Sequence, residues 1–246
     1  MFSSRSGGSV VPRPMTSFVG RERELAEASR LLAGNRLLAL TGPGGSGKTR
    51  LAIELTTRVI DDFPDGVYFV PLAAIRDPAL VPSSIAQSLG LQDSRERPLV
   101  EHLASYLGER RALLVLDNFE RVLGAAELVA DLLAAGDGLH VLVTSRAPLH
   151  LSGEQEFPVP PLAVPDARAA TTPASLAAYE SVRLFAARAA AEHGTHRQQP
   201  ARDITEQLVA PGDRVAQGLL PIGQVATPAH EQAEGLVQAS QDRLRW

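Results

Sequence analysis

One eight-residue segment constrains the fold of this chain more than any other: Gly42-Pro43-Gly44-Gly45-Ser46-Gly47-Lys48-Thr49. It follows a short apolar run at 36–41 and precedes a stretch at 48–60 whose apolar residues recur at helical spacing. Glycines let a backbone wrap closely around an anion, and the N-terminus of the following helix adds a partial positive charge. The segment therefore predicts a phosphate-binding loop between a buried strand and a helix, the alternative being a glycine-rich turn without a ligand.

Strand and helix patterns alternate along the first two thirds of the chain. Apolar runs rich in Leu and Val predict buried strands at 36–41, 67–70, 112–116 and 139–143. Prolines restrict the run at 156–159 to the edge of a sheet. Helices are predicted at 21–33, 48–60, 78–89, 99–107 and 120–134. The fold class that follows is α/β, a P-loop NTPase parallel sheet with helices on both faces and a partial helical C-terminal appendage.

The chain is expected to divide into four regions. Residues 1–16 are rich in Ser, Gly and Pro and predict a flexible leader, and 17–162 form the P-loop nucleotide-binding domain. Prolines open the next region, 163–193, which is expected to hold a linker and the start of a helical domain, with a helix at 174–192. Residues 194–246 lack a regular apolar pattern and are left as a poorly specified tail.

Composition excludes several classes of protein. The 246 residues carry 24 Lys and Arg against 28 Asp and Glu, so no basic excess indicates nucleic-acid binding, and no helix-turn-helix pattern is visible. The absence of cysteine excludes disulfides and thiolate metal sites and suits a reducing compartment. No apolar run approaches the roughly 20 residues of a membrane span, and the N-terminal residues do not form a signal peptide. We therefore expect a soluble, cytoplasmic protein without a membrane partner.

The loop carries the main chemical prediction. Lys48 follows the last glycine, where its ammonium can reach the β- and γ-phosphates of a nucleotide. The hydroxyl of Thr49 is placed to ligate Mg²⁺. ATP or ADP with Mg²⁺ is thus the predicted cofactor, in contact with all eight loop residues and with Arg50 after them.

A second pattern lies at 113–120, where four apolar residues are followed by Asp117 and, three residues later, Glu120. Asp117 ends a buried strand, which is where open α/β sheets bind their ligands, so we predict that it holds Mg²⁺ directly or through water. Such a run is common by chance, but its partnership with a loop about 70 residues upstream favours function. Glu120 has two interpretations: it orients a water for attack on the γ-phosphate, or it is a first-turn helix acid stabilised by the helix dipole.

A third pattern ends the predicted strand at 139–143 with Thr144, Ser145 and Arg146. A guanidinium matches phosphate oxygens bidentately, so Arg146 is predicted to sense or stabilise the γ-phosphate. The alternative is a solvated arginine at the end of a strand.

Four motifs in this order, at 19–22, 42–49, 113–120 and 143–146, together resemble the nucleotide-binding module of STAND ATPases. These are the signal-transduction ATPases with numerous domains, relatives of the NB-ARC and AAA+ modules. The closest likeness is to bacterial transcriptional regulators of the LuxR-like and SARP-like kind, and it covers about residues 16–193. The resemblance implies that Val19, Gly20 and Arg21 lie near the adenine and that Arg146 is a phosphate sensor. It also implies a switch that ADP holds closed, ATP exchange opens toward oligomers and slow hydrolysis resets.

The resemblance also has a limit. The family continues with a Gly-Leu-Pro-Leu motif, winged-helix and repeat domains, for which this sequence has no clear equivalent, so a truncated module is expected. The leading hypothesis is an ATP- or ADP-binding regulatory module from a signalling or transcriptional regulator. Lys48, Asp117, Glu120 and Arg146 are its candidate catalytic residues for slow hydrolysis of ATP to ADP and phosphate. Its predicted partners are nucleotide and either a second copy or other regulator domains. The alternatives are a metabolic P-loop enzyme, such as a small-molecule kinase, and a truncated interaction scaffold with a structural nucleotide.

Overall fold

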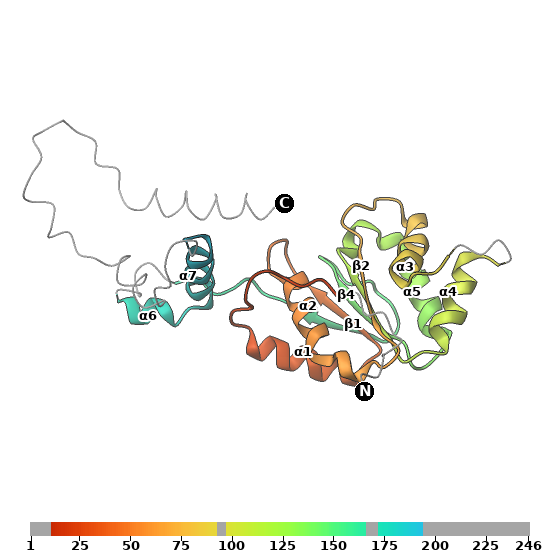
Figure 1. Cartoon of the computed structure of the whole chain (residues 1–246), viewed down its shortest axis with the longest axis horizontal. Coiled ribbons are helices and arrows are strands. Elements are labelled where there is room, and N and C mark those ends of the chain that lie inside the picture. The colour runs from red at the N-terminus through yellow and green to blue at the C-terminus, as the bar shows by residue number, and fades with distance from the viewer. Residues whose placement is uncertain (1–10, 93–96, 166–171, 194–246) are drawn as a thin grey trace, which may run out of the picture. The chain divides into compact units, whose positions relative to one another are not determined.

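A computed structural model describes residues 11–92, 97–165 and 172–193. The chain divides into two compact units, Met1–Leu162 and Ala163–Trp246, here called the first and the second unit (Figure 1). The described part of the second unit consists of two helices, α6 (Pro173–Ala177) and α7 (Glu180–His193). Most of the predicted leader and the whole predicted tail at 194–246 lie outside the described residues.

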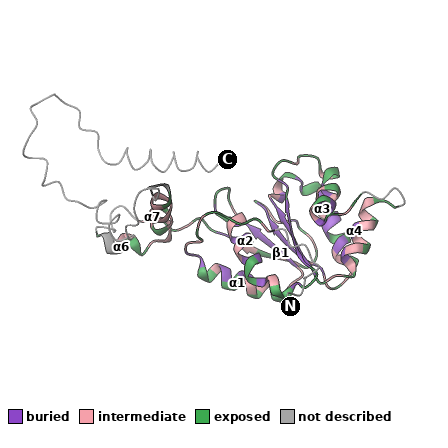
Figure 2. Ribbon diagram, viewed as in Figure 1, coloured by how far each residue is buried: buried purple, intermediate pink, exposed green. Residues whose placement is uncertain are grey.

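The first unit is built on a five-stranded sheet with the order β2-β3-β4-β1-β5, in which every neighbouring pair is parallel. The strands are β1 (Leu37–Thr41), β2 (Val67–Pro71), β3 (Leu113–Asp117), β4 (His140–Thr144) and β5 (Glu154–Pro158). Strands β1 and β3 are buried along their whole length, as the purple ribbon of β1 in Figure 2 shows. Strand β5 lies at one edge and is only partly buried, as its prolines predicted.

Helices cover both faces of this sheet. They are α1 (Glu22–Gly34), α2 (Lys48–Val59), α3 (Val81–Leu89), α4 (Leu99–Gly108) and α5 (Ala126–Ala134). Successive strand residues point to opposite faces. In β3, Leu113 and Val115 therefore join the core beneath α1 and α2, whereas Leu114 and Leu116 join the core beneath α3, α4 and α5. The predicted α/β fold is confirmed.

The segment after β3 differs from the predicted single helix at 120–134. Two short 3-10 turns, η3 (Phe119–Arg121) and η4 (Leu123–Ala125), come before α5. Asn118 adopts the left-handed backbone region with φ 63°, which turns the chain away from the strand, and Phe119 then enters the core with no exposed surface. Glu120 consequently lies in the first turn of a three-residue 3-10 helix and not at the start of the predicted helix at 120–134.

Two other predicted helices are also interrupted. The segment 78–89 begins as a 3-10 turn, η2 (Pro78–Leu80), before α3, and the segment 174–192 is divided into α6 and α7. A further turn, η1 (Ile60–Asp62), follows α2. Of the helices in the described residues, none has both the length and the apolar character that crossing a bilayer requires.

Candidate functional site

The residues singled out by the sequence come together at the carboxyl edge of the sheet. The loop at 42–49 leaves the end of β1, Asp117 ends β3, and Thr144 ends β4. Because β4 lies between β3 and β1 in the sheet, the ends of all three strands are neighbours. This edge is where parallel α/β sheets bind their ligands.

The loop packs tightly against the chain that follows β5. Gly42 has φ 138°, and a Cβ atom placed on it would lie 2.6 Å from the carbonyl oxygen of Val159. Only glycine fits this position without displacing the backbone. The loop then delivers Lys48 to the first position of α2, where its Nζ donates hydrogen bonds of 2.8 Å each to the carbonyl oxygens of Gly42 and Pro43.

Burial and three charged side chains shift the pKa of Lys48. Burial lowers the pKa of its ammonium, the carboxylates of Glu120 and Asp117 raise it, and the guanidinium of Arg146 lowers it. Lys48 is only 8% exposed, and the loop carbonyls stabilise its buried ammonium. Two cations and two carboxylates thus lie close enough to one another to interact electrostatically.

The carboxylate of Asp117 accepts hydrogen bonds from two hydroxyl groups. Its Oδ1 accepts a 2.7 Å hydrogen bond from Thr49 Oγ1 and a 2.6 Å hydrogen bond from Thr144 Oγ1. Thr144 Oγ1 in turn accepts from the backbone N–H of Asn118 at 3.0 Å. Asp117 is 6% exposed, so these bonds fix its carboxylate at the edge of the sheet.

Thr144 is a site residue that the sequence analysis did not select. It appeared there only as part of the strand end before Arg146. The feature that marks Thr144 is its position at the end of β4, the strand that pairs with β3, which ends at Asp117. Its burial was known only from the structure: the Thr144 side chain is 1% exposed, and a buried hydroxyl needs a polar partner.

Arg146 and Glu120 form an ion pair beside the loop. Arg146 Nε lies 3.4 Å from Glu120 Oε1, and the side chains are 64% and 16% exposed, respectively. The Nη2 atom of Arg146 also lies 3.3 Å from the position that a Cβ on Gly44 would take. The two residues predicted to act near the γ-phosphate are therefore in contact with each other, and the guanidinium lies over the loop.

Arg21 lies against the loop on a different side. It adopts a left-handed backbone conformation directly before α1, is 5% exposed, and follows Gly20, which is also buried. Its Nη2 donates to the carbonyl oxygens of Ser46 at 2.8 Å and Pro160 at 2.6 Å. Arg21 therefore links the loop to the chain that leaves β5. The base-side role that the resemblance implies for Val19, Gly20 and Arg21 stays a prediction.

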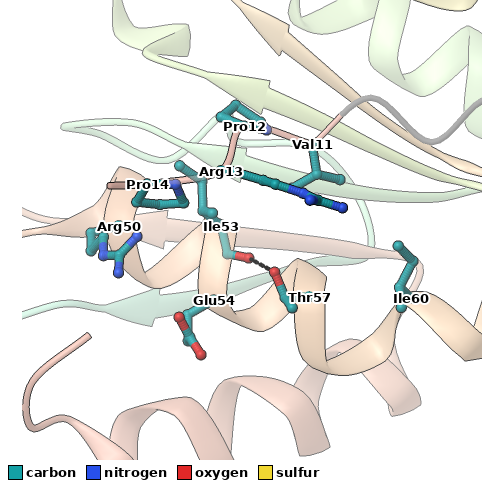
Figure 3. Close-up of a pocket in the computed structure, with 9 residues that line it drawn as sticks. All are labelled: Val11, Pro12, Arg13, Pro14, Arg50, Ile53, Glu54, Thr57 and Ile60. Atoms are coloured by element: carbon teal, nitrogen blue, oxygen red, sulfur yellow. Dashed lines mark hydrogen bonds between the residues drawn. The ribbon is translucent and has the colours of Figure 1, made fainter. Parts of the chain in front are cut away.

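Arg50 contacts the segment that precedes α1. Its Nη2 donates a 2.6 Å hydrogen bond to the carbonyl oxygen of Thr16, and its guanidinium lies 5.8 Å from the centre of the Phe18 ring. Arg50 also lines a cavity of about 410 Å³ between residues 11–14 and α2 (Figure 3). The other lining residues are Val11, Pro12, Arg13, Pro14, Ile53, Glu54, Thr57 and Ile60. The loop glycines, Lys48 and Asp117 do not line this cavity, so it is separate from the site at the strand ends.

The donor set fits a phosphate group with its metal ion. Ser46 Oγ is buried and lacks a hydrogen-bond partner within the described part of the chain, so it is a polar atom left for a ligand. The described residues contain no group of three His, Asp or Glu side chains that could hold a metal ion by themselves. One carboxylate, Asp117, beside one hydroxyl, Thr49, is instead the arrangement in which Mg²⁺ completes its coordination with phosphate oxygens and water.

Comparison with known proteins gives one family and several relatives. A family model described as an AAA domain matches residues 31–158. The chain is 41% identical over 160 residues to a putative HTH-type transcriptional regulator of Mycobacterium tuberculosis, a match that covers 65% of this chain and 16% of the regulator. It is 35% identical over 154 residues to the regulatory protein AfsR of Streptomyces coelicolor, covering 55% of this chain and 15% of AfsR. The chain thus spans less than a fifth of either relative.

Among solved structures, a STAND protein with a tetratricopeptide repeat sensor from Pyrococcus horikoshii is similar, with 16% identity and a TM-score of 0.47. That match covers 80% of this chain and 28% of the other. The sequence matches confirm the resemblance to bacterial transcriptional regulators that the motifs indicated.

Proposed function

Because the chain belongs to the AAA domain family, by the match over residues 31–158, we propose that its first unit binds ATP or ADP with Mg²⁺ and serves as the nucleotide switch of a regulator. One observation carries this proposal: the 2.7 Å hydrogen bond between Thr49 Oγ1 and Asp117 Oδ1. It joins the end of the glycine-rich loop to a carboxylate 68 positions away in the sequence. Both groups lie at the carboxyl edge of the sheet, where parallel α/β sheets bind their ligands.

Each site residue has a role in this proposal. Lys48 supplies the main countercharge to the phosphates, and the backbone N–H groups at 42–49 bind their oxygens. Thr49 and Asp117 hold Mg²⁺, with Thr144 keeping the carboxylate of Asp117 in place. When bound, Mg²⁺ neutralises charge on the β- and γ-phosphate oxygens.

Hydrolysis, in this proposal, is slow and resets the switch. Water attacks the γ-phosphorus, the bond to the β–γ bridging oxygen breaks, and ADP and phosphate leave. Glu120 lies beside the loop and is the residue that can orient this water, whereas Arg146 can stabilise charge on the phosphoryl oxygens. The ion pair engages Oε1 of Glu120 and Nε of Arg146 with each other, which supports a slow rate.

The regulatory role rests on the relatives and on the chain after β5. The relatives are named as transcriptional regulators, so we propose that this unit controls partner domains or self-association in a larger regulator. We propose 17–162 as the nucleotide-binding domain and 163–193 as a linker and the start of a helical domain. The compact unit that ends at Leu162 supports this boundary. Arg21 contacts the loop at Ser46 and the exit chain at Pro160, so a change in the loop can reach the chain before that boundary.

Titration calorimetry of the whole chain with ADP and with a non-hydrolysable ATP analogue tests the proposal, and Asp117→Asn tests its metal site. We expect the wild type to bind both nucleotides, and Mg²⁺ to tighten binding of the analogue. Asparagine can still accept the bonds from Thr49 and Thr144 but removes the charge that attracts the cation. Asp117→Asn should therefore keep ADP binding in a chelator and lose roughly tenfold or more of the affinity for the Mg²⁺ complex of the analogue.

Asp131→Asn is the matched control, because Asp131 is an exposed acid on α5. It should leave both affinities as in the wild type. A wild-type chain that binds neither nucleotide would contradict the proposed function. An Asp117→Asn chain with unchanged dependence on Mg²⁺ would show that another residue holds the metal.

A further inference from the structure

The two members of the ion pair between Glu120 and Arg146 differ in how far they are buried. Glu120 is held in place: it follows Phe119, which is fully buried, and its own side chain is 16% exposed. Its Oε2 is buried and accepts no hydrogen bond from the described residues. Arg146 is 64% exposed and its backbone follows the end of β4, so its guanidinium can leave the pair without disturbing the core.

The pair lies beside the loop that is proposed to bind the phosphates. The Arg146 guanidinium touches the loop at Gly44, and its charge and that of Glu120 both act on Lys48, the residue that reaches toward the β- and γ-phosphates. A phosphoryl group and a carboxylate present the same bidentate target to a guanidinium. Arg146 directs its Nε to Glu120 Oε1, so a phosphoryl group that binds bidentately to that edge of the guanidinium displaces the carboxylate.

We propose that Glu120 competes with the terminal phosphate of ATP for Arg146, so that the ion pair sets the preference of the site for ADP over ATP. ADP lacks the third phosphate and leaves the pair intact. ATP gains the contact with Arg146 only after the pair breaks. This proposal rests on the proposed function, and it adds a residue that determines which nucleotide is preferred.

The test compares four chains: wild type, Glu120→Gln, Arg146→Ala and the double variant. Affinities for ADP and for a non-hydrolysable ATP analogue are measured with Mg²⁺ by calorimetry, so that turnover plays no part. Glutamine keeps the shape of Glu120 but releases Arg146. We expect Glu120→Gln to raise the ratio of analogue affinity to ADP affinity by about two- to fivefold, the range for a partly exposed ion pair. Arg146→Ala should lower that ratio.

The double variant distinguishes competition for Arg146 from direct repulsion of the phosphate by Glu120. If the two residues compete as proposed, Glu120→Gln has a smaller effect on the ratio when Arg146 is absent. An increase of the same size without Arg146 would mean direct repulsion of the phosphate by Glu120 and would overturn the proposal, as would an unchanged ratio in Glu120→Gln. Glu101→Gln, at an exposed position on α4, is the control for loss of one negative charge and should leave the ratio unchanged.

A second variant and the wild-type affinities complete the test. Should Glu120→Gln not fold, Glu120→Asp replaces it: its shorter carboxylate withdraws from Arg146 and should shift the ratio in the same direction. Failure of the wild type to bind either nucleotide overturns the proposed function. Wild-type binding with no response of the ratio overturns only this inference.

Discussion

Lys48→Ala is expected to weaken the binding of ADP and ATP by about 100-fold. The variant loses the hydrogen bonds from the ammonium to charged phosphate oxygens, and their free energy corresponds to a change in affinity of about this size. Lys48 begins α2 beside the loop and is the residue that places a cation among the loop carbonyls. Arg146 is 64% exposed beside Glu120 and does not occupy the position of the Lys48 ammonium among the loop carbonyls. Calorimetric titration of the whole chain with ADP measures the effect, and an unchanged affinity would refute the assignment of the loop.

Arg58→Ala is the matched control for this variant. Arg58 is an exposed cation in the last turn of the same helix, so its removal changes net charge equally and should leave ADP affinity unchanged. The sequence offers a second, direct readout, since Lys48 is the only lysine in the chain. In protein labelled at lysine, a single side-chain signal is expected in the NMR spectrum, and addition of ADP should shift it.

Phe119→Ala is expected to have the largest effect on stability, lowering the free energy of unfolding by about 3–5 kcal/mol. Phe119 is the largest fully buried side chain in the described part of the protein, and it belongs to the core beneath α3, α4 and α5. It also anchors the turn that carries Glu120 beside Arg146. Urea denaturation followed by far-ultraviolet circular dichroism measures the change.

Phe185→Ala provides the comparison for that measurement. Phe185 is 57% exposed on α7, so the same truncation there removes little buried surface and should change stability by no more than about 0.5 kcal/mol. Equal effects of the two substitutions would contradict the assignment of Phe119 to the core.

The loop and the strand ends could be predicted from the sequence because their signals are local. The glycines at 42–47 and Lys48 stand in one unbroken segment, and each buried strand is a continuous apolar run. Asp117 was found in the same way, as the polar residue that ends such a run. Parallel strands bring their carboxyl ends to one edge, so finding the strands was enough to place these residues near one another.

The path of the chain after β3 was not predictable by the same means. The apolar spacing at 120–134 suits a helix, but Asn118 in the left-handed region and the buried Phe119 divide the segment into two turns and a shorter helix. The gain from burying a large aromatic ring outweighs the preference of a few residues for helix. Glu120 therefore lies in a short turn before α5, where it forms an ion pair with Arg146.

By itself, the sequence determined the α/β class, the loop, and the strand ends that carry Asp117 and Arg146, because each depends on residues adjacent in the chain. Only the tertiary structure decided what the side chains touch. It joined Thr144 to Asp117, Arg21 to Ser46 and Pro160, and Glu120 to Arg146. These partners are separated by 25 to 139 positions, and buried polar groups take whichever partner the packed core brings within reach.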